Sequence, residues 1–202
     1  MSLNLISDPW IPVACADGSR RVIAPWQMAE PGILAPDWPR PDLNIACYEL
    51  LIGLVYLSDP PANERDWDRR QSPDPARLRE RLAPLAPAFN LLGEGPLFLQ
   101  DLELLEGEAN PPDMLFIDSA GANTARNNAD LMVHRDRYPA LDLPMAAMAL
   151  YTFQAFAPSG GAGNRTSMRG GGPLVTLVDP GQGLWPLVWA NVPYGQPASV
   201  QR

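Results

Sequence analysis

The hydrophobic pattern of residues 43–57 predicts the longest helix of the chain. Apolar positions recur with a period near 3.6 residues, which is typical of a helix that buries one face. Asp42 precedes this segment as a candidate cap, and Asp59-Pro60-Pro61 ends it. We therefore expect a core helix, in which Cys47 packs as a small hydrophobic residue. The predicted buried positions are Leu43, Ala46, Cys47, Leu50, Leu51, Leu54 and Val55, widened by Ile45 and Ile52.

Two further helices follow from the same reasoning. Pro144 opens a segment that runs to Phe156, with a core stripe formed by Met145, Met148, Ala149, Thr152 and Phe156. Pro75 is placed at the first position of a short helix through Leu82, with Asp74 as its cap.

Short apolar and β-branched runs predict strands in the rest of the chain. Asp17-Gly18 predicts a hairpin between residues 10–13 and residues 20–24. Residues 25–41 are rich in proline and predict a loop, and residues 63–71 predict an exposed charged segment. These elements favour a single α+β domain over residues 1–202, with short, mostly antiparallel strands, a few core helices and long Pro/Gly-rich loops. The other predicted strands are residues 3–6, 97–99, 114–117, 174–178 and 184–190, the last at a sheet edge because of Pro186.

Residues 157–173 form a glycine-rich stretch between a predicted helix and a predicted strand. Six of the seventeen residues are glycine, and Arg165 and Arg169 lie among them. Such a loop brings bare backbone N–H groups and two guanidinium groups close to a ligand, and successive N–H groups favour anions. The alternative is that these glycines only make a tight connection between helix and strand.

The charge distribution argues against general nucleic-acid binding and favours a role in an assembly. The 202 residues carry a net charge of −8 and no lysine. Residues 121–172 nevertheless hold five arginines against three aspartates, a balance of +2. A locally basic segment on an acidic body is typical of a subunit of a larger complex, although chance clustering of solvated charges is the alternative.

The usual parts of an enzyme are missing from the sequence. His134-Arg135-Asp136 resembles a kinase catalytic loop, but Leu141 stands where that loop needs asparagine. His134 is the only histidine, and no nucleophile elbow accompanies it. Cys15 and Cys47 form neither a zinc motif nor a disulfide framework. We therefore predict no catalytic residue, no metal and no cofactor, and a cytoplasmic chain without a membrane span.

Several stretches together resemble the N-terminal part of the large subunit of the type I-E Cascade complex, the CasA family of CRISPR surveillance proteins. Their shared order along nearly the whole chain makes the resemblance specific. The stretches are Leu5-Ile6-Ser7-Asp8-Pro9-Trp10-Ile11-Pro12-Val13, Leu97-Phe98-Leu99-Gln100, residues 121–135, Ala157-Pro158-Ser159-Gly160-Gly161-Ala162-Gly163 and Met168-Arg169-Gly170-Gly171-Gly172-Pro173.

The resemblance implies a non-catalytic subunit of an RNA-guided antiviral complex. Such a subunit recognises the protospacer-adjacent motif in double-stranded DNA and offers a surface to the helicase–nuclease. Its glycine loop, which enters the minor groove, corresponds to Gly160, Gly161, Ala162, Gly163 and Asn164, followed by Arg165 and Arg169. A second loop, near the guide RNA 5′ handle and the neighbouring Cascade subunit, corresponds to residues 127–135, with Asn127, Asn128, Met132, Val133, His134 and Arg135.

The sequence departs from the family in two ways. Asp142 and Met145 stand where many relatives carry a Cys-x-x-Cys pair, so that pair can bind no metal here. Relatives are also much longer, and their strand-separating wedge and C-terminal helical bundle would lie beyond residue 202. We therefore expect either a truncated or a naturally short form, without the helical bundle.

Two other functions are compatible with the same residues. A small-anion-binding enzyme would use Arg165 and Arg169 in a closed pocket. A purely structural assembly subunit would bury them in a protein interface. An open surface shared by Arg126, Arg135, Arg165 and Arg169 would favour DNA recognition instead.

Overall fold

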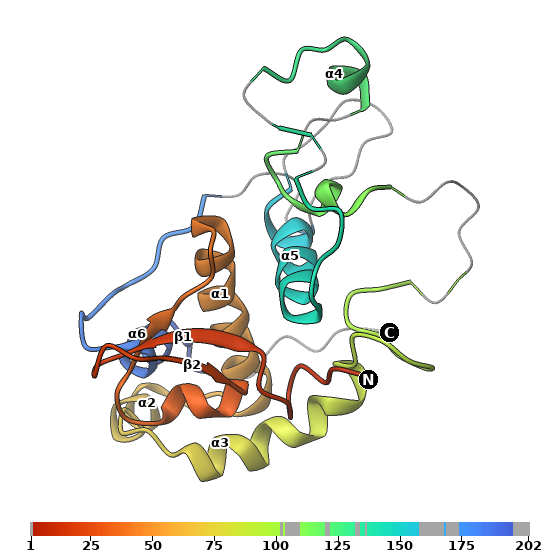
Figure 1. Cartoon of the computed structure of the whole chain (residues 1–202). Coiled ribbons are helices and arrows are strands. Elements are labelled where there is room, and N and C mark those ends of the chain that lie inside the picture. The colour runs from red at the N-terminus through yellow and green to blue at the C-terminus, as the bar shows by residue number, and fades with distance from the viewer. Residues whose placement is uncertain are drawn as a thin grey trace. The chain divides into compact units, whose positions relative to one another are not determined.

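The computed structural model describes residues 2–101, 103, 110–119, 122–131, 134–135, 137–157, 168 and 174–195. The chain divides into two compact units, which are described separately (Figure 1). Unit 1 comprises Met1–Phe98 and Val175–Arg202, and unit 2 comprises Leu99–Leu174. The antiparallel sheet and the helices confirm the predicted α+β class. The single domain over residues 1–202 stays a prediction.

Unit 1 contains a three-stranded antiparallel sheet of order β2-β1-β3. The strands are β1 (Ile11–Cys15), β2 (Arg20–Ile23) and β3 (Ile33–Pro36). Ile11 pairs with Ile23, and Val13 pairs with both Arg21 and Pro36. The Asp17-Gly18 hairpin is confirmed, because Gly18 has φ +82° and the Asp17 carboxylate accepts the Ser19 N–H at 2.9 Å.

The predicted loop over residues 25–41 was wrong. This stretch forms a 3₁₀ helix, η1 (Pro25–Ala29), and the edge strand β3. Pro36 ends that strand at the sheet edge, where its missing N–H need not remove a hydrogen bond between strands. The predicted strand over residues 3–6 was also wrong, because it is reduced to one bridge between Asn4 and Asn90. The Asn4 side chain instead accepts the N–H groups of Ile6 and Ser7, which turns the chain.

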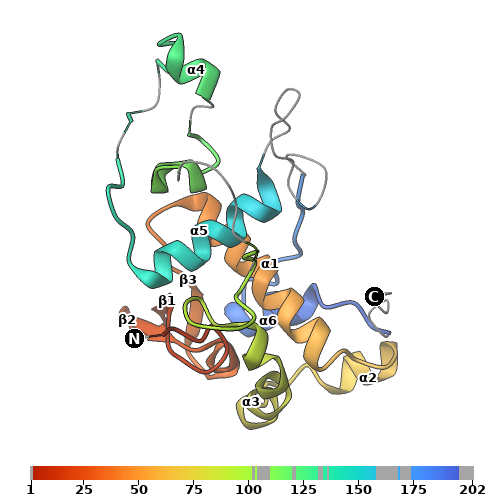
Figure 2. The same cartoon turned by 90° about the vertical axis from the view of Figure 1, so that its right-hand side faces the viewer.

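The helix α1 (Pro41–Ser58) confirms the longest predicted helix. Two other helices, α3 (Pro75–Leu82) and α6 (Leu184–Ala190), pack against it (Figure 2). Its cap differs from the prediction. Arg40 is the N-cap, Pro41 follows it, and Asp42 lies in the first turn, where it pairs with the Arg40 guanidinium at 2.8 Å. The buried face contains seven of the predicted residues: Leu43, Ala46, Cys47, Leu50, Leu51, Leu54 and Val55. The predicted widening of this face was wrong, because Ile45 is 44% exposed and Ile52 is only half-buried.

Two short helices follow α1 in unit 1. The exposed charged segment contains α2 (Glu64–Arg69), whose N-cap Asn63 accepts the Asp66 N–H at 3.0 Å. The predicted short helix is confirmed as α3 (Pro75–Leu82), because Asp74 accepts the Arg77 N–H at 3.0 Å. A 3₁₀ segment, η2 (Ala83–Ala88), continues from it. The predicted strand over residues 97–99 is absent, with Leu97 making one bridge to Asn90.

The C-terminal segment of unit 1 corrects two strand predictions. Residues 184–190 form a helix, α6 (Leu184–Ala190), in which Pro186 occupies the first turn, where its missing N–H costs no helical hydrogen bond. Residues 174–178 form no strand. The side-chain amide of Asn191 instead accepts the Val178 N–H and donates to the Val178 carbonyl, each at 2.8 Å.

Unit 2 contains η3 (Pro112–Leu115), α4 (Ala122–Arg126) and α5 (Leu143–Phe156). The predicted strand over residues 114–117 was wrong, because two prolines start the 3₁₀ turn of η3 there. The helix predicted from Pro144 is confirmed as α5, which packs against η3. Asp142 is its N-cap and accepts the Met145 N–H at 2.8 Å. The buried residues of α5 are Ala147, Met148, Ala149, Thr152 and Ala155, whereas Met145 and Phe156 of the predicted stripe are only half-buried.

Candidate nucleic-acid interface

The predicted glycine loop lies outside the described residues, whereas the chain at its edges is described. Ala157 donates its N–H to the Phe153 carbonyl at 3.0 Å and so caps α5. The Met168 N–H donates to the Gln154 carbonyl at 2.8 Å, and the Met168 side chain is exposed. The chain therefore returns at Met168 to the last turn of α5. The predicted residues outside the described part are Gly160, Gly161, Ala162, Gly163, Asn164, Arg165 and Arg169.

The second predicted loop begins where α4 ends. Asn128 has φ +48°, a left-handed conformation that asparagine adopts more readily than most residues. Its N–H donates to the Ala125 carbonyl at 3.2 Å, and the Ala129 N–H donates to the Thr124 carbonyl at 3.0 Å. These bonds satisfy carbonyls that the end of the short helix leaves open. Of this loop, Met132 and Val133 lie outside the described residues.

Arg135 holds this loop together through one guanidinium group. Its Nε donates to Asp130 Oδ2 and its Nη2 to Asp130 Oδ1, each at 2.5 Å. The same Nη2 donates to the Ala125 carbonyl at 2.8 Å and to Asn128 Oδ1 at 3.1 Å. We call Ala125, Asn128, Asp130 and Arg135 the Arg135 clasp. Hydrogen bonding from Arg135 lowers the pKa of Asp130, so the two charges largely cancel.

Other side chains of the loop are open to solvent. Leu131 is 89% exposed, and Asn127 and His134 are also exposed. His134 Nδ1 lies 2.7 Å from the Arg135 carbonyl oxygen. Arg126 ends α4 with an exposed side chain, and it forms no ion pair with any residue that the structure describes. The end of α4 and the loop therefore offer a cation that no described acid neutralises, a side-chain amide and an apolar side chain.

Asp113 fixes the chain that follows the clasp. Its buried carboxylate accepts the Arg137 N–H at 2.9 Å and the Tyr138 N–H at 2.8 Å. Arg137 also forms a fork on the Asp118 carboxylate, with distances of 2.9 and 3.1 Å. The Tyr138 ring lies 4.3 Å from the ring of Phe116, centroid to centroid. Asp113 and Asp118, which precede the loop in sequence, thus supply the partners of Arg137.

The structure brings only part of the predicted site together. Asn128 and Arg135 are in contact, and Asn127 lies beside them in sequence with an exposed side chain. Sequence reasoning missed Asp130 and Asp113, which order the loop. The only available signal for Asp130 is an acid five residues before Arg135 in a segment rich in turn-forming residues.

The described residues offer neither a metal site nor a membrane span. No group of three or more His, Cys, Asp or Glu side chains within them could hold a metal ion. Within the same residues, the helices are too short or too polar to cross a bilayer. Burial raises the pKa of the Cys47 thiol to about 12, which makes it a poor nucleophile and agrees with its predicted core position.

The sequence and the fold are both similar to those of known proteins of one family. The family model for CRISPR-associated protein Cse1 matches residues 4–201. A CasA/Cse1 protein of Thermus thermophilus is 30% identical over 166 residues, covering 78% of this chain and 32% of the relative. The chain thus spans about a third of that relative's length.

Solved structures with the same fold include Cse1 of Thermobifida fusca, with a TM-score of 0.70 at 20% identity, covering 95% of this chain and 39% of that one. A chain from a CRISPR RNA-guided surveillance complex in its pre-nicking state matches with a TM-score of 0.67 at 19% identity, covering 99% of this chain and 45% of that one. Since the family model spans nearly all of the sequence, the chain belongs to the Cse1 (CasA) family of CRISPR-associated proteins.

Proposed function

We propose that this chain is a non-catalytic subunit of an RNA-guided CRISPR surveillance complex that recognises a short motif beside the target in double-stranded DNA. The observation that carries the proposal is the family match over residues 4–201. The fold shared with a chain of a CRISPR RNA-guided surveillance complex supports it further. Its partners would be the DNA target, the guide RNA 5′ handle, the other Cascade subunits and the helicase–nuclease.

The glycine loop is the part proposed to contact the DNA. Gly160, Gly161 and Gly163 carry no side chain, so the backbone between them can approach the floor of the minor groove. The minor groove offers mainly acceptors plus the amino group of guanine, a pattern that a backbone can read. The anchoring of Ala157 and Met168 on the last turn of α5 supports a loop presented from a fixed base.

The second loop is the part proposed to contact the guide RNA and a neighbouring subunit. Leu131 is 89% exposed, and an apolar side chain in this position gains by burial against a partner. Arg126 supplies a cation that can contact a phosphate, because no described acid neutralises it. The Arg135 clasp would hold Asn127 and Leu131 in a fixed turn for that contact.

The proposed test is motif discrimination by the assembled complex. Gly161→Leu or Gly163→Leu should abolish the preference for the correct adjacent motif, because a bulky side chain blocks approach to the groove floor. The matched control is Arg165→Ala. It should weaken binding to all sequences about equally and reduce the slope of log affinity against log salt by about one unit. The proposal fails if both leucine variants keep full discrimination, because the loop would then only connect helix and strand.

A further inference from the structure

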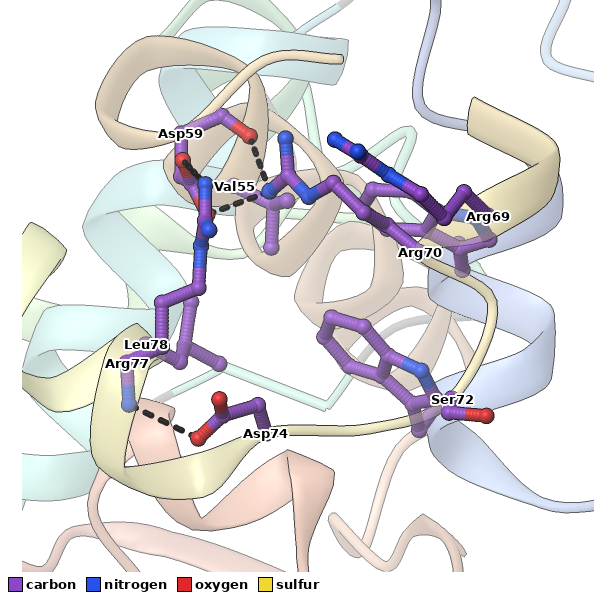
Figure 3. A pocket seen from close by; sticks show the side chains of 10 residues that line it. Val55, Asp59, Arg69, Arg70, Ser72, Asp74, Arg77 and Leu78 are labelled. Carbon is purple, nitrogen blue, oxygen red and sulfur yellow. Dashed lines mark hydrogen bonds and ion pairs between the residues drawn. The ribbon is translucent and has the colours of Figure 1, made fainter. Parts of the chain in front are cut away.

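A pocket of about 170 Å³ lies in unit 1 between the end of α1, the helices α2 and α3, and α6 (Figure 3). Val55, Leu78 and Trp185 form an apolar part of its lining, while Arg69, Arg70 and Arg77 bring guanidinium groups to it. Figure 3 shows these three arginine side chains extending toward the end of the pocket where Asp59 lies. Neither the sequence resemblance nor the proposed function assigns a role to this site.

The Asp59 carboxylate forms ion pairs with several arginines. Asp59 follows the last turn of α1, and its side chain is only 11% exposed. Arg77 donates to it from Nε at 2.7 Å and from Nη2 at 2.8 Å, and Arg70 donates to the same carboxylate. Arg81 Nε lies 3.7 Å from Asp59 Oδ1. Three guanidinium groups therefore converge on a single negative charge.

The frame around these cations is built by tryptophans. The Trp67 indole N–H donates to the Trp189 carbonyl, and the Trp189 indole N–H donates to the Trp67 carbonyl, both at 3.1 Å. Trp185 donates to the Gln71 carbonyl at 2.9 Å. The Arg70 guanidinium lies 5.2 Å from the Trp189 ring centroid. Because these contacts lock α2 against α6, the arginines are positioned before any ligand arrives.

Hydrogen-bond donors remain available at the pocket. Arg69 is 78% exposed, and its Nη2 donates to Asp66 at 2.7 Å. In the part of the chain that the structure describes, Arg69 Nε and Nη1, Arg77 Nη1 and the Ser72 hydroxyl have no hydrogen-bond partner. The charged side chains that line the pocket, together with their ion-pair partners, are the four arginines Arg69, Arg70, Arg77 and Arg81 and the three carboxylates Asp59, Asp66 and Asp74, an excess of one positive charge. An anion with a single charge would balance this excess.

We propose that this pocket binds a phosphate group. The free donors of Arg69 and Arg77 come from α2 and α3, whereas Ser72 lies at the end of the pocket away from Asp59 (Figure 3). Donors from two different helices suit a tetrahedral oxyanion, whose oxygens point in several directions. A planar carboxylate is served by one arginine fork, as Asp59 is by Arg77. A phosphodiester carries one negative charge, as the pocket requires, and inorganic phosphate offers the same oxygens. The site is therefore specific for phosphate chemistry, from either a nucleic-acid strand or the free anion.

The experiment measures binding by calorimetry on the full chain at low ionic strength. Inorganic phosphate and single-stranded oligothymidylate are the two probes, and poly-glutamate represents an acidic protein segment. Arg69→Ala is the test variant, since its one ion pair is exposed and its loss spares the fold. Arg20→Ala is the matched control, because Arg20 is 81% exposed and pairs with Asp37 at 2.6 Å elsewhere in unit 1.

We expect Arg69→Ala to weaken binding of phosphate or the oligonucleotide by about tenfold or more, and Arg20→Ala to leave it unchanged. Tighter binding of the oligonucleotide would identify a strand as the source of the phosphate, and tighter binding of inorganic phosphate would identify the free anion. The proposal is overturned if neither phosphate probe binds, if Arg69→Ala matches Arg20→Ala, or if poly-glutamate binds more tightly through Arg69.

Discussion

Arg135 and Asp130 form a two-bond ion pair within a single loop, with both N–H···O distances at 2.5 Å. The same guanidinium also reaches the Ala125 carbonyl at the end of α4. The Asp130 carboxylate neutralises the Arg135 guanidinium, and most of its N–H donors already have acceptors within the loop, so Arg135 attracts a phosphate only weakly. We therefore expect Arg135 to order the loop that carries Asn127 and Leu131, and its predicted direct contact with nucleic acid stays a prediction.

The first prediction concerns the pH dependence of the Arg135 clasp. Arg135 lowers the pKa of Asp130 below its usual 3.8 in the folded chain. The pair therefore stabilises the loop fully above pH 3.8, and this stabilisation is lost as the pH falls through the lowered pKa. NMR of the Arg135 Nε–H signal should show protection above that pH and its loss below.

In the variant Asp130→Asn, the same signal should be weakly protected at every pH. Asp17→Asn is the control, because the pKa of Asp17 is also lowered, by hydrogen bonds from Ser19 in unit 1. It should leave the Arg135 signal as in the unmodified chain. Equal protection in Asp130→Asn and the unmodified chain at neutral pH would show that the clasp does not order the loop.

The sequence could predict the elements whose signal is local. The 3.6-residue period gave α1 and α5, and Asp74-Pro75 gave the start of α3, because periodicity and capping depend on neighbouring residues. The segment Leu184–Ala190 has no such period, since it is apolar all round, and short runs of this kind fit a strand equally well. Packing against α1 and β3 decides in favour of the helix α6.

The ordering contacts of the candidate site could not be predicted for a related reason. Asp130 and Arg135 meet because Asn128 adopts a left-handed conformation and turns the chain. Asp113 meets Tyr138 across 25 residues. Neither pairing follows a helix or strand period, so the sequence does not indicate which basic or backbone group each acid will meet. The glycine loop was predicted from its composition and from the family resemblance, and it stays a prediction because it lies outside the described residues.

The second prediction concerns Gly183, which precedes α6. Its φ is +103°, and an added Cβ would lie 2.9 Å from the Ile33 carbonyl oxygen of β3. Gly183→Ala should lower the free energy of unfolding by about 2–3 kcal/mol, measured by urea denaturation. Gly181→Ala is the control, because its φ of +67° is also positive but a Cβ there meets nothing within 4 Å. The control should cost about 1 kcal/mol. Equal costs would show that the approach of Gly183 to β3 is not tight.

The third prediction concerns the buried carboxylate of Asp59. Asp59→Ala leaves Arg70, which is 15% exposed, with only the Asp66 carboxylate at 3.3 Å as a counter-charge. Loss of one partner from a buried ion pair typically costs about 3–5 kcal/mol, so the urea midpoint should fall strongly. Asp37→Ala removes the partner of exposed Arg20 and should cost about 1 kcal/mol or less. A loss at Asp59 no larger than at Asp37 would show that water replaces the carboxylate without penalty.

The last prediction separates Arg126 from Arg135 in the proposed complex. Arg126 is exposed without a described ion-pair partner, whereas Arg135 is bound to Asp130. If Arg126 contacts a phosphate, Arg126→Ala should weaken association with the guide RNA complex and flatten its salt dependence by about one unit. Arg135→Ala should weaken association at every salt concentration and leave the slope unchanged, because it loosens the loop.

A double-mutant cycle tests that difference. Asp130→Ala should weaken association as Arg135→Ala does but to a smaller extent, because Arg135 keeps its bonds to Ala125 and Asn128. The double variant should be no worse than Arg135→Ala, because the Arg135–Asp130 contact is already lost there. The measurement is the affinity of each variant for the guide RNA complex over a series of salt concentrations. A flattened slope in Arg135→Ala alone, with Asp130→Ala neutral or tighter, would mean that Arg135 leaves the clasp in the complex and contacts the nucleic acid itself.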